Sequence, residues 1–345
     1  MKQIINQSNK KAAFTPLEKK PYPLDVVKKR GDGLKSHPSF LTGFTIVELL
    51  TVMSIIVILI SLLVPALNMV RKYAWEVKQK AQFHSIDAAI ELFNTEFSGY
   101  PDSSERGTEP SGQPYCGAMK LCEAIMGRDL MGFHPDSTFR SDLKDASGID
   151  DLYPDDLNPE TPEGIENLKK RKGPYLDVAT ANAFRLGRTA GHDGLFENNI
   201  LSPKRLDADT FVICDVFGIK NITLAKGDVV RAGTPILYYR ANTSSKTMFD
   251  DHGDPDKQQI YNYEDNAPLL SLGKLPNPKP TDPATWHSLY KYPGKFYNEG
   301  PKGEEDYKII DPRISTPWPH RPDSYILISA GADGEYGTSD DILNF

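Results

Sequence analysis

The one long apolar run of this chain lies close to the N-terminus. Between residues 44 and 70 the only charged side chain is that of Glu48. A helix of this length crosses the hydrocarbon core of a bilayer, which is about 30 Å thick. A carboxylate at the centre of that core costs roughly 2.5–3.5 kcal/mol, and less near its face. We therefore predict a transmembrane helix over residues 44–70 with an unusual charge near its start.

After residue 70 the pattern changes to one apolar position in every three or four. These positions are Phe83, Ile86, Ile90, Phe93 and Phe97. Such spacing places the apolar side chains on one face of a helix. Residues 71–98 are therefore predicted to extend the transmembrane helix as an amphipathic half that packs on a globular domain. Pro65 predicts a kink or local melting, because proline lacks an amide hydrogen and clashes with the preceding turn.

Residues 99–345 contain only short periodic segments, separated by stretches rich in Gly, Pro, Asp and Ser. Runs of β-branched and aromatic residues predict strands at 210–218, 235–241 and 324–329. Short helices are predicted at 121–131 and 163–170. The expected fold class is α+β, in which the long N-terminal helix packs on a small antiparallel β-sheet with long loop insertions.

Charge divides the chain into a basic leader and an acidic body. Residues 1–43 carry nine Lys or Arg against three Asp or Glu, a net charge of +6. Because the whole chain carries −7, residues 44–345 carry −13. The basic flank of a membrane span tends to stay in the cytoplasm, which predicts a cytoplasmic leader and a body on the far side. The acidic body argues against nucleic acid as a partner.

The position of the small residue Gly43 distinguishes this segment from a secretory signal peptide. A signal peptide has its small-residue cleavage site after a shorter apolar core, whereas Gly43 precedes the run. Cleavage after Gly43 would remove the leader, keep the helix and leave a free ammonium on Phe44. Glu48 lies about one helical turn further on. An ammonium on one copy and a carboxylate on its neighbour would then neutralise each other in a packed array of helices.

Residues 43–50 read Gly-Phe-Thr-Ile-Val-Glu-Leu-Leu. This segment resembles the class III signal of type IV prepilins and type II secretion pseudopilins, in which a prepilin peptidase cuts after the glycine and methylates the new N-terminal residue. The resemblance assigns cleavage to Gly43, N-methylation to Phe44, and filament assembly to Glu48. Pro65 falls where many members of the family have a helix-loosening proline. The leader of 43 residues is long for the family.

The resemblance also implies a function and a location. It predicts a pilin-like structural subunit of a type II secretion pseudopilus, without enzymatic activity. The chain would cross the bacterial inner membrane once, with residues 99–345 as a periplasmic pilin-like domain, before it enters a filament in the periplasm or at the cell surface. The implied partners are the prepilin peptidase, other pilin or pseudopilin subunits, and the inner-membrane assembly platform of the secretion system.

A loop rich in oxygen ligands closes the chain. Residues 329–342 read Ser-Ala-Gly-Ala-Asp-Gly-Glu-Tyr-Gly-Thr-Ser-Asp-Asp-Ile. Calcium takes six to eight oxygens from carboxylates, hydroxyls and carbonyls on a flexible turn. The segment resembles the C-terminal loop of the major type II pseudopilin, where calcium is bound. The resemblance assigns Asp333, Ser339, Asp340 and Asp341 as ligands, and a solvated turn is the alternative.

The cysteines leave two possibilities open. The chain contains Cys116, Cys122 and Cys214, none in a CxxC pair. In a domain outside the cytoplasm, Cys116 and Cys122 can close a small disulfide loop, or both can remain as buried thiols.

Two other functions stay open, because the body is much larger than that of a typical major pseudopilin. The first is a minor subunit of a type IV pilus, whose insertions within residues 102–320 bind a ligand for adhesion or uptake. The second is a membrane-tethered periplasmic enzyme or binding protein. That reading requires a pocket that gathers His192, His252 or the acidic loops.

Overall fold

The computed structural model describes residues 45–104, 112–154, 157–178, 180–189, 191–224, 226–244, 260–279, 287, 296 and 319–345. Contacts divide the chain into two units, Met1–Leu59 and Ile60–Phe345. The described part of the first unit is the beginning of a helix, and none of its side chains is buried. The second unit contains the core of the protein.

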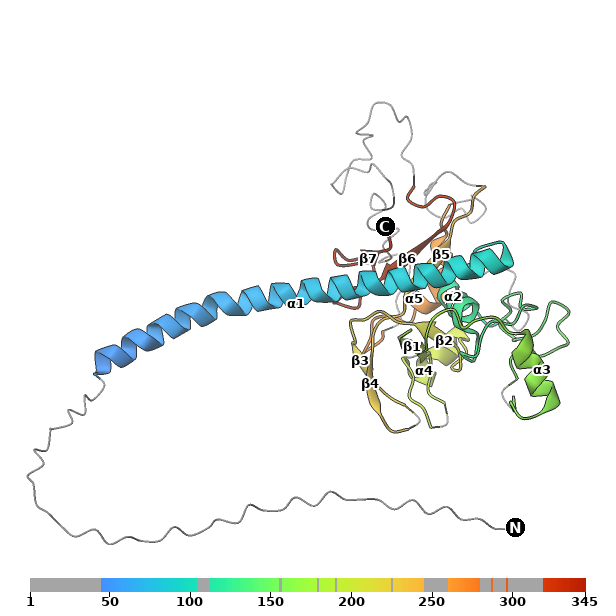
Figure 1. Ribbon diagram of the computed structural model, residues 1–345, viewed down its shortest axis with the longest axis horizontal. Coiled ribbons are helices and arrows are strands. Elements are labelled where there is room, and N and C mark those ends of the chain that lie inside the picture. The colour runs from blue at the N-terminus through green and yellow to red at the C-terminus, as the bar shows by residue number, and fades with distance from the viewer. Residues whose placement is uncertain are drawn as a thin grey trace, which may run out of the picture. The chain divides into compact units, whose positions relative to one another are not determined.

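The first element is α1 (Ile46–Phe97), a helix of 52 residues that Figure 1 shows as one unbroken ribbon. The prediction of one helix through both halves is therefore confirmed. The local melting predicted at Pro65 as one of two possibilities does not occur, since the helix continues through that residue. A proline removes a single backbone hydrogen bond, and the apolar turns on both sides keep theirs. The helix ends where Ser98 adopts a left-handed φ of 57° before Gly99.

The predicted apolar face of the second half of α1 is the face that packs on the domain. Phe83, Ile86, Ile90 and Phe93 are buried, and Phe97 is half-buried beside them. These side chains share an apolar cluster with Tyr238, Tyr325 and Leu327 from two strands and with Leu121 and Ile125 from a second helix. The rings of Phe93 and Phe133 meet edge to face with centroids 5.1 Å apart.

The strands form three small antiparallel sheets. They are β1 (Ala183–Arg185) with β2 (Phe211–Ile213), β3 (Lys220–Thr223) with β4 (Val229–Ala232), and β5 (Leu237–Arg240), β6 (Tyr325–Ser329) and β7 (Ile342–Leu343) in that order. In the last sheet Leu237 pairs with Ile328, so strands that are distant in the sequence form the centre of the fold. The strands predicted at 235–241 and 324–329 are confirmed, and the hairpin of β3 and β4 was not predicted.

The strand predicted at 210–218 does not join the central sheet. Only its first part is strand, and it pairs with β1. Its end meets the start of β5 through one bridge between Cys214 and Pro235. The amide of Ile236 donates to the carbonyl of Ile213, and the amide of Asp215 donates to that of Thr234, one on each side of this bridge. The pairing between the two segments is limited to this one bridge. The single sheet of the prediction is therefore divided.

The remaining helices are short. They are α2 (Gly117–Met126), α3 (Pro162–Lys170), α4 (Asn198–Leu201) and α5 (Ala267–Leu270), with the 3₁₀ turns η1 (Ser202–Lys204) and η2 (Tyr263–Asn266). Helix α3 agrees with the prediction at 163–170, and Thr161 caps it by accepting a hydrogen bond from the amide of Gly164 at 3.2 Å. Helix α2 starts and ends earlier than the predicted 121–131. It ends at Gly127, whose φ of 86° suits glycine.

Helix α2 lies between the two halves of the core. Ala118 and Met119 belong to one apolar cluster, whereas Leu121 and Ile125 belong to the cluster that covers α1. All ten of its residues are buried. A helix that is buried all round has no face exposed to solvent, so the periodicity of its sequence gives little indication of its bounds.

Candidate functional site

The first candidate site is the beginning of α1, where Glu48 and Thr45 bond to each other. The amide and the hydroxyl of Thr45 both donate to Oε2 of Glu48, at 2.9 and 2.8 Å. The amide of Glu48 donates in return to Oγ1 of Thr45 at 3.2 Å. This reciprocal pattern is a capping box, which satisfies amides that the first turn of a helix leaves without partners.

The capping box was not predicted, although its signal is present in the sequence as Thr-x-x-Glu before an apolar run. It directs the carboxylate of Glu48 back toward the start of the helix. The predicted cleavage residues Gly43 and Phe44, and the leader before them, lie outside the described residues.

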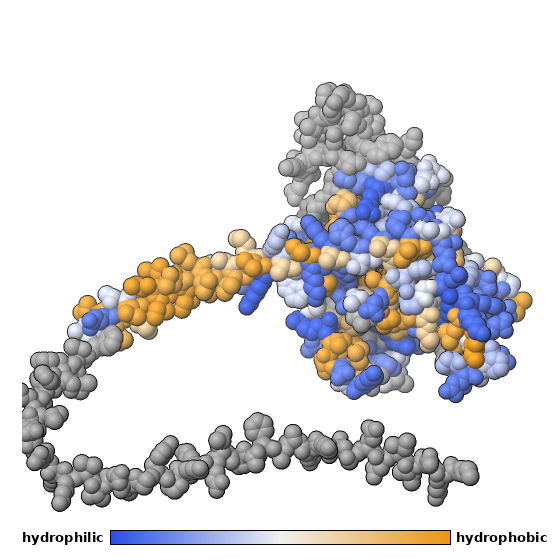
Figure 2. Space-filling model, viewed as in Figure 1, coloured by the Kyte–Doolittle hydropathy of each residue, from blue (hydrophilic) through white to orange (hydrophobic). Residues whose placement is uncertain are grey.

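The apolar half of α1 is exposed along its whole length. Figure 2 shows this part of the helix as an almost continuous hydrophobic surface. The side chains from Ile46 to Val70 make no contact that buries them, and the segment is long and apolar enough to span a membrane. Exposed apolar area on this scale needs a cover of lipid or protein. The predicted transmembrane segment is therefore consistent with the fold.

The second candidate site is the loop between β6 and β7. Its carboxylates accept hydrogen bonds from the loop's own amides: Asp333 from Glu335 at 2.8 Å, Asp340 from Asp333 at 3.1 Å, and Asp341 from Gly337 at 2.9 Å. These bonds hold the turn in a defined shape.

Asp333 and Asp340 are close enough to perturb each other. Burial raises the pKa of Asp333, and the negative charge of Asp340 raises it further. Burial acts in the same direction on Asp340, but hydrogen bonds from Thr338 and Asp333 outweigh it and lower the pKa of Asp340. Asp340 therefore disfavours the charged form of Asp333, and a bound cation would relieve this effect.

The loop brings together only part of the predicted ligand set. Ser339 is exposed in the same turn. Among the described residues, no three or more His, Cys, Asp or Glu side chains form a group that could hold a metal ion. A calcium site here would therefore depend on carbonyl, hydroxyl and water oxygens in addition to the carboxylates.

The disulfide considered for Cys116 and Cys122 is not formed, and all three cysteines are buried thiols. Cys116 immediately precedes α2 and packs in one apolar cluster, whereas Cys122 lies in the other. Six residues along a helix turn the side-chain direction by about 600°, which leaves the two side chains roughly 120° apart. The helix therefore separates the two thiols. Burial raises the pKa of Cys122 to about 12, so this thiol is unreactive.

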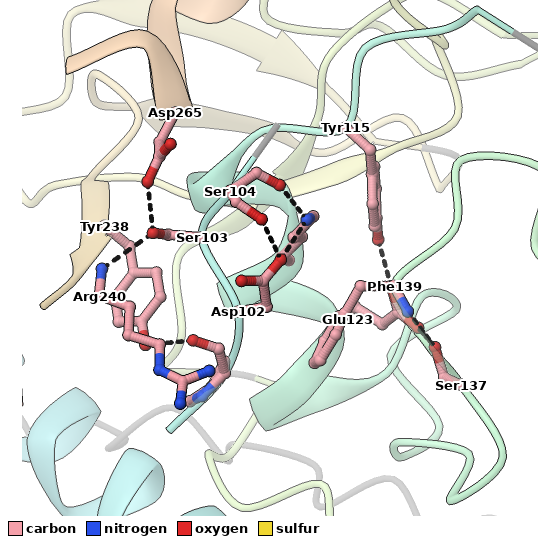
Figure 3. A network of polar contacts seen from close by, with 12 residues as sticks. Asp102, Ser103, Ser104, Tyr115, Glu123, Ser137, Phe139, Tyr238, Arg240 and Asp265 are labelled. Carbon is pink, nitrogen blue, oxygen red and sulfur yellow. Dashed lines mark hydrogen bonds and ion pairs between the residues drawn. The ribbon is translucent and has the colours of Figure 1, made fainter. Parts of the chain in front are cut away.

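A buried polar network, shown in Figure 3, connects α2 to the segments around it. The ammonium of Lys120, which is fully buried, lies 2.7 Å from a carboxylate oxygen of Asp102. Burial acts to raise the pKa of Asp102, but Lys120 outweighs it and the pKa lies below its usual value. Ser103 donates to Asp265 at 2.6 Å, and burial raises the pKa of Asp265 to about 7.

A second part of this network surrounds Glu123. Its two carboxylate oxygens accept hydrogen bonds from Tyr115 and Ser137, each at 2.5 Å (Figure 3). Glu123 and Tyr115 are both buried. These side chains bind one another, so the network joins segments of the chain. The alternative site residue His192 is half-buried in a turn where its backbone pairs with Thr189. His252 lies outside the described residues.

Comparisons with models of protein families, with curated proteins and with solved structures found no match for this chain.

Proposed function

We propose that this chain is a pilin-like structural subunit of a type II secretion pseudopilus, processed by a prepilin peptidase and assembled through its N-terminal helix. The observation that carries the proposal is α1. One continuous helix is an exposed apolar segment in its first half and the spine of a globular domain in its second. A helix of this kind can be stored in a membrane and then packed against copies of itself, because its apolar surface needs a cover in both states.

The capping box supports the role proposed for Glu48. Its carboxylate bonds to the first amide ahead of the helix, at Thr45. Cleavage after Gly43 would place an ammonium on the next residue toward the N-terminus. The carboxylate would then be available to that ammonium or to the ammonium of a neighbouring subunit, and either pairing lowers the cost of a charge in an apolar environment.

We also propose that the loop between β6 and β7 binds calcium through Asp333, Ser339, Asp340 and Asp341. The support is the pair formed by Asp333 and Asp340, in which the negative charge of Asp340 disfavours the charged form of Asp333. Bound calcium would neutralise this pair and fix the connection between the last two strands of the central sheet. The loop would supply carboxylate, hydroxyl and carbonyl oxygens, and water would complete the set.

The mature N-terminus tests the proposed function most directly. We expect the chain, co-expressed with a prepilin peptidase, to be cut after Gly43, so that intact-mass and peptide mass spectrometry find a chain beginning at Phe44 with or without an N-methyl group. A peptidase with its catalytic residues replaced is the control and should leave the leader attached.

An uncut chain, or a cut at another position, would contradict the proposal and favour a membrane-tethered enzyme or binding protein. A cut after Gly43 is expected for a pseudopilin and for a minor type IV pilin alike. A pseudopilin and a minor type IV pilin are distinguished by the assembly machinery that incorporates the mature chain into a filament.

A further inference from the structure

Two exposed aromatic residues lie on α1 just beyond its apolar segment. Val70 is the last residue of the apolar run, and Tyr73 and Trp75 follow on opposite faces of the helix, exposed by 68% and 42%. At 1.5 Å per residue, Trp75 lies about 7.5 Å beyond Val70 along the axis. Headgroups occupy about 5–8 Å on each side of the hydrocarbon core, and Trp and Tyr are enriched there. A span that ends at Val70 therefore places both rings at the headgroup layer.

One turn of the globular domain lies at the same level. The ring centroid of Phe217 is 6.3 Å from that of Trp75. The segment before Phe217 is bound to the helix, since the amide of Val216 donates to Gln79 at 3.0 Å and Gln82 donates to the carbonyl of Cys214 at 2.9 Å. Both glutamines are buried. The position of Phe217 along the helix axis is therefore set by these hydrogen bonds to α1.

The charges at this level are opposite in sign to those of the body. Residues 71–80 contain four Lys or Arg and one Glu, a net charge of +3 in a region that totals −13 from residue 44 onward. The ammonium of Lys78 lies over the ring of Trp75, 5.0 Å from its centroid. The exposed Arg231 lies beside the same turn. Its Cβ is 3.1 Å from the position that a Cβ at Gly218, the residue after Phe217, would occupy.

We propose that Trp75, Lys78, Phe217 and Arg231 form a surface that docks the globular domain on anionic phospholipid headgroups. We call it the membrane-exit surface. Aromatic rings prefer the headgroup layer, and clustered Lys and Arg are attracted to anionic lipid. The inference rests on the proposed membrane span and adds that the domain itself contacts the bilayer before assembly. Extraction into a filament must then break this contact in addition to withdrawing the helix.

Tryptophan quenching by lipids that carry a nitroxide on the headgroup tests this surface in the full-length chain reconstituted in nanodiscs. Trp286→Phe and Trp318→Phe leave Trp75 as the single reporter. Adding Trp75→Phe with Phe217→Trp moves the reporter into the domain while keeping an aromatic pair. Adding Trp75→Phe with Leu92→Trp gives a matched control on the same helix. Leu92 is 54% exposed and lies about 25 Å further along the axis than Trp75.

We expect headgroup quenching at positions 75 and 217 and none at position 92. Quenching at 217 should be greater in phosphatidylglycerol than in phosphatidylcholine, and Lys78→Gln with Arg231→Gln should reduce it. A reporter introduced by Leu59→Trp, read with acyl-chain nitroxides, follows insertion of the helix separately. If the tryptophan at position 59 is quenched by acyl-chain nitroxides but the tryptophan at position 217 is not quenched by headgroup nitroxides, the docking surface is overturned and the anchor is left intact. Equal quenching in the two lipids would overturn recognition of anionic headgroups, and absence of quenching at 59 would overturn both the anchor and the docking.

Discussion

Glu48→Ala is expected to leave cleavage after Gly43 intact and to abolish incorporation of the chain into filaments. In the proposed function, cleavage would depend on Gly43, whereas assembly would depend on the carboxylate that neutralises an N-terminal ammonium inside packed apolar helices. Removing one partner of a charge pair in such an environment costs about 3–5 kcal/mol, because the other charge is left uncompensated. A loss of that size in every subunit contact is enough to prevent a polymer from forming.

The capping box makes it necessary to separate two roles of Glu48. Besides its charge, the side chain caps the helix by accepting from the amide of Thr45. Glu48→Gln keeps a hydrogen-bond acceptor at the third position of the helix, where Glu and Gln both occur in capping boxes, but removes the charge. Thr45→Ala keeps the charge and removes the cap, at a cost of about 1 kcal/mol to the helix.

Filament incorporation, measured by shearing and immunoblotting, distinguishes the roles. If charge pairing drives assembly, Glu48→Gln fails as completely as Glu48→Ala, and Thr45→Ala assembles. Normal assembly of Glu48→Gln together with failure of Thr45→Ala would show that Glu48 acts as a helix cap, and the docking role would be wrong.

Removal of calcium is expected to lower the melting temperature of the detergent-solubilised chain. A ligand that binds only the folded state at a hundred times its Kd stabilises that state by about 2.7 kcal/mol. In a domain of this size each kcal/mol corresponds to about 2–4 °C. Excess chelator should therefore lower the melting temperature by about 5–10 °C at such a calcium concentration.

Asp333→Asn provides the specific test of the calcium loop. Asparagine retains an oxygen that can accept from the amide of Glu335, and it removes the charge that Asp340 disfavours. The variant should keep or raise the melting temperature in chelator and lose the response to calcium. Asp323→Asn is a control, since Asp323 is an exposed carboxylate outside the loop. An unchanged melting temperature of the unaltered chain in chelator would refute calcium binding, and a full response in Asp333→Asn would refute the assigned ligand.

The long helix and its buried face were predictable from the sequence. The spacing of Phe83, Ile86, Ile90 and Phe93 is a local pattern, and it indicates which face must be covered before the cover is known. The apolar run before it is equally local. The same holds for two strands of the central sheet, where short β-branched and aromatic runs mark Leu237–Arg240 and Tyr325–Ser329.

The tertiary structure alone decided what those elements contact. The polar residues Gln79 and Gln82 are buried on α1, where the backbone of residues 214–216 bonds to Oε1 of Gln79 and to Nε2 of Gln82. Lys120 is buried because Asp102 lies beside it. Burial of a polar group depends on a partner that is distant in the sequence, so no periodicity predicts it.

The sequence by itself therefore predicted the long apolar helix and the helix face that packs, which the structure shows, and it supplied the residues proposed for the two candidate sites. Tertiary structure decided the pairing of the strands, the burial of α2 on both sides, the separation of Cys116 from Cys122, and the level at which Phe217 meets the helix. The physical reason is that hydrophobic periodicity and capping are short-range properties of the chain, whereas strand pairing and the burial of polar groups require contacts between distant segments.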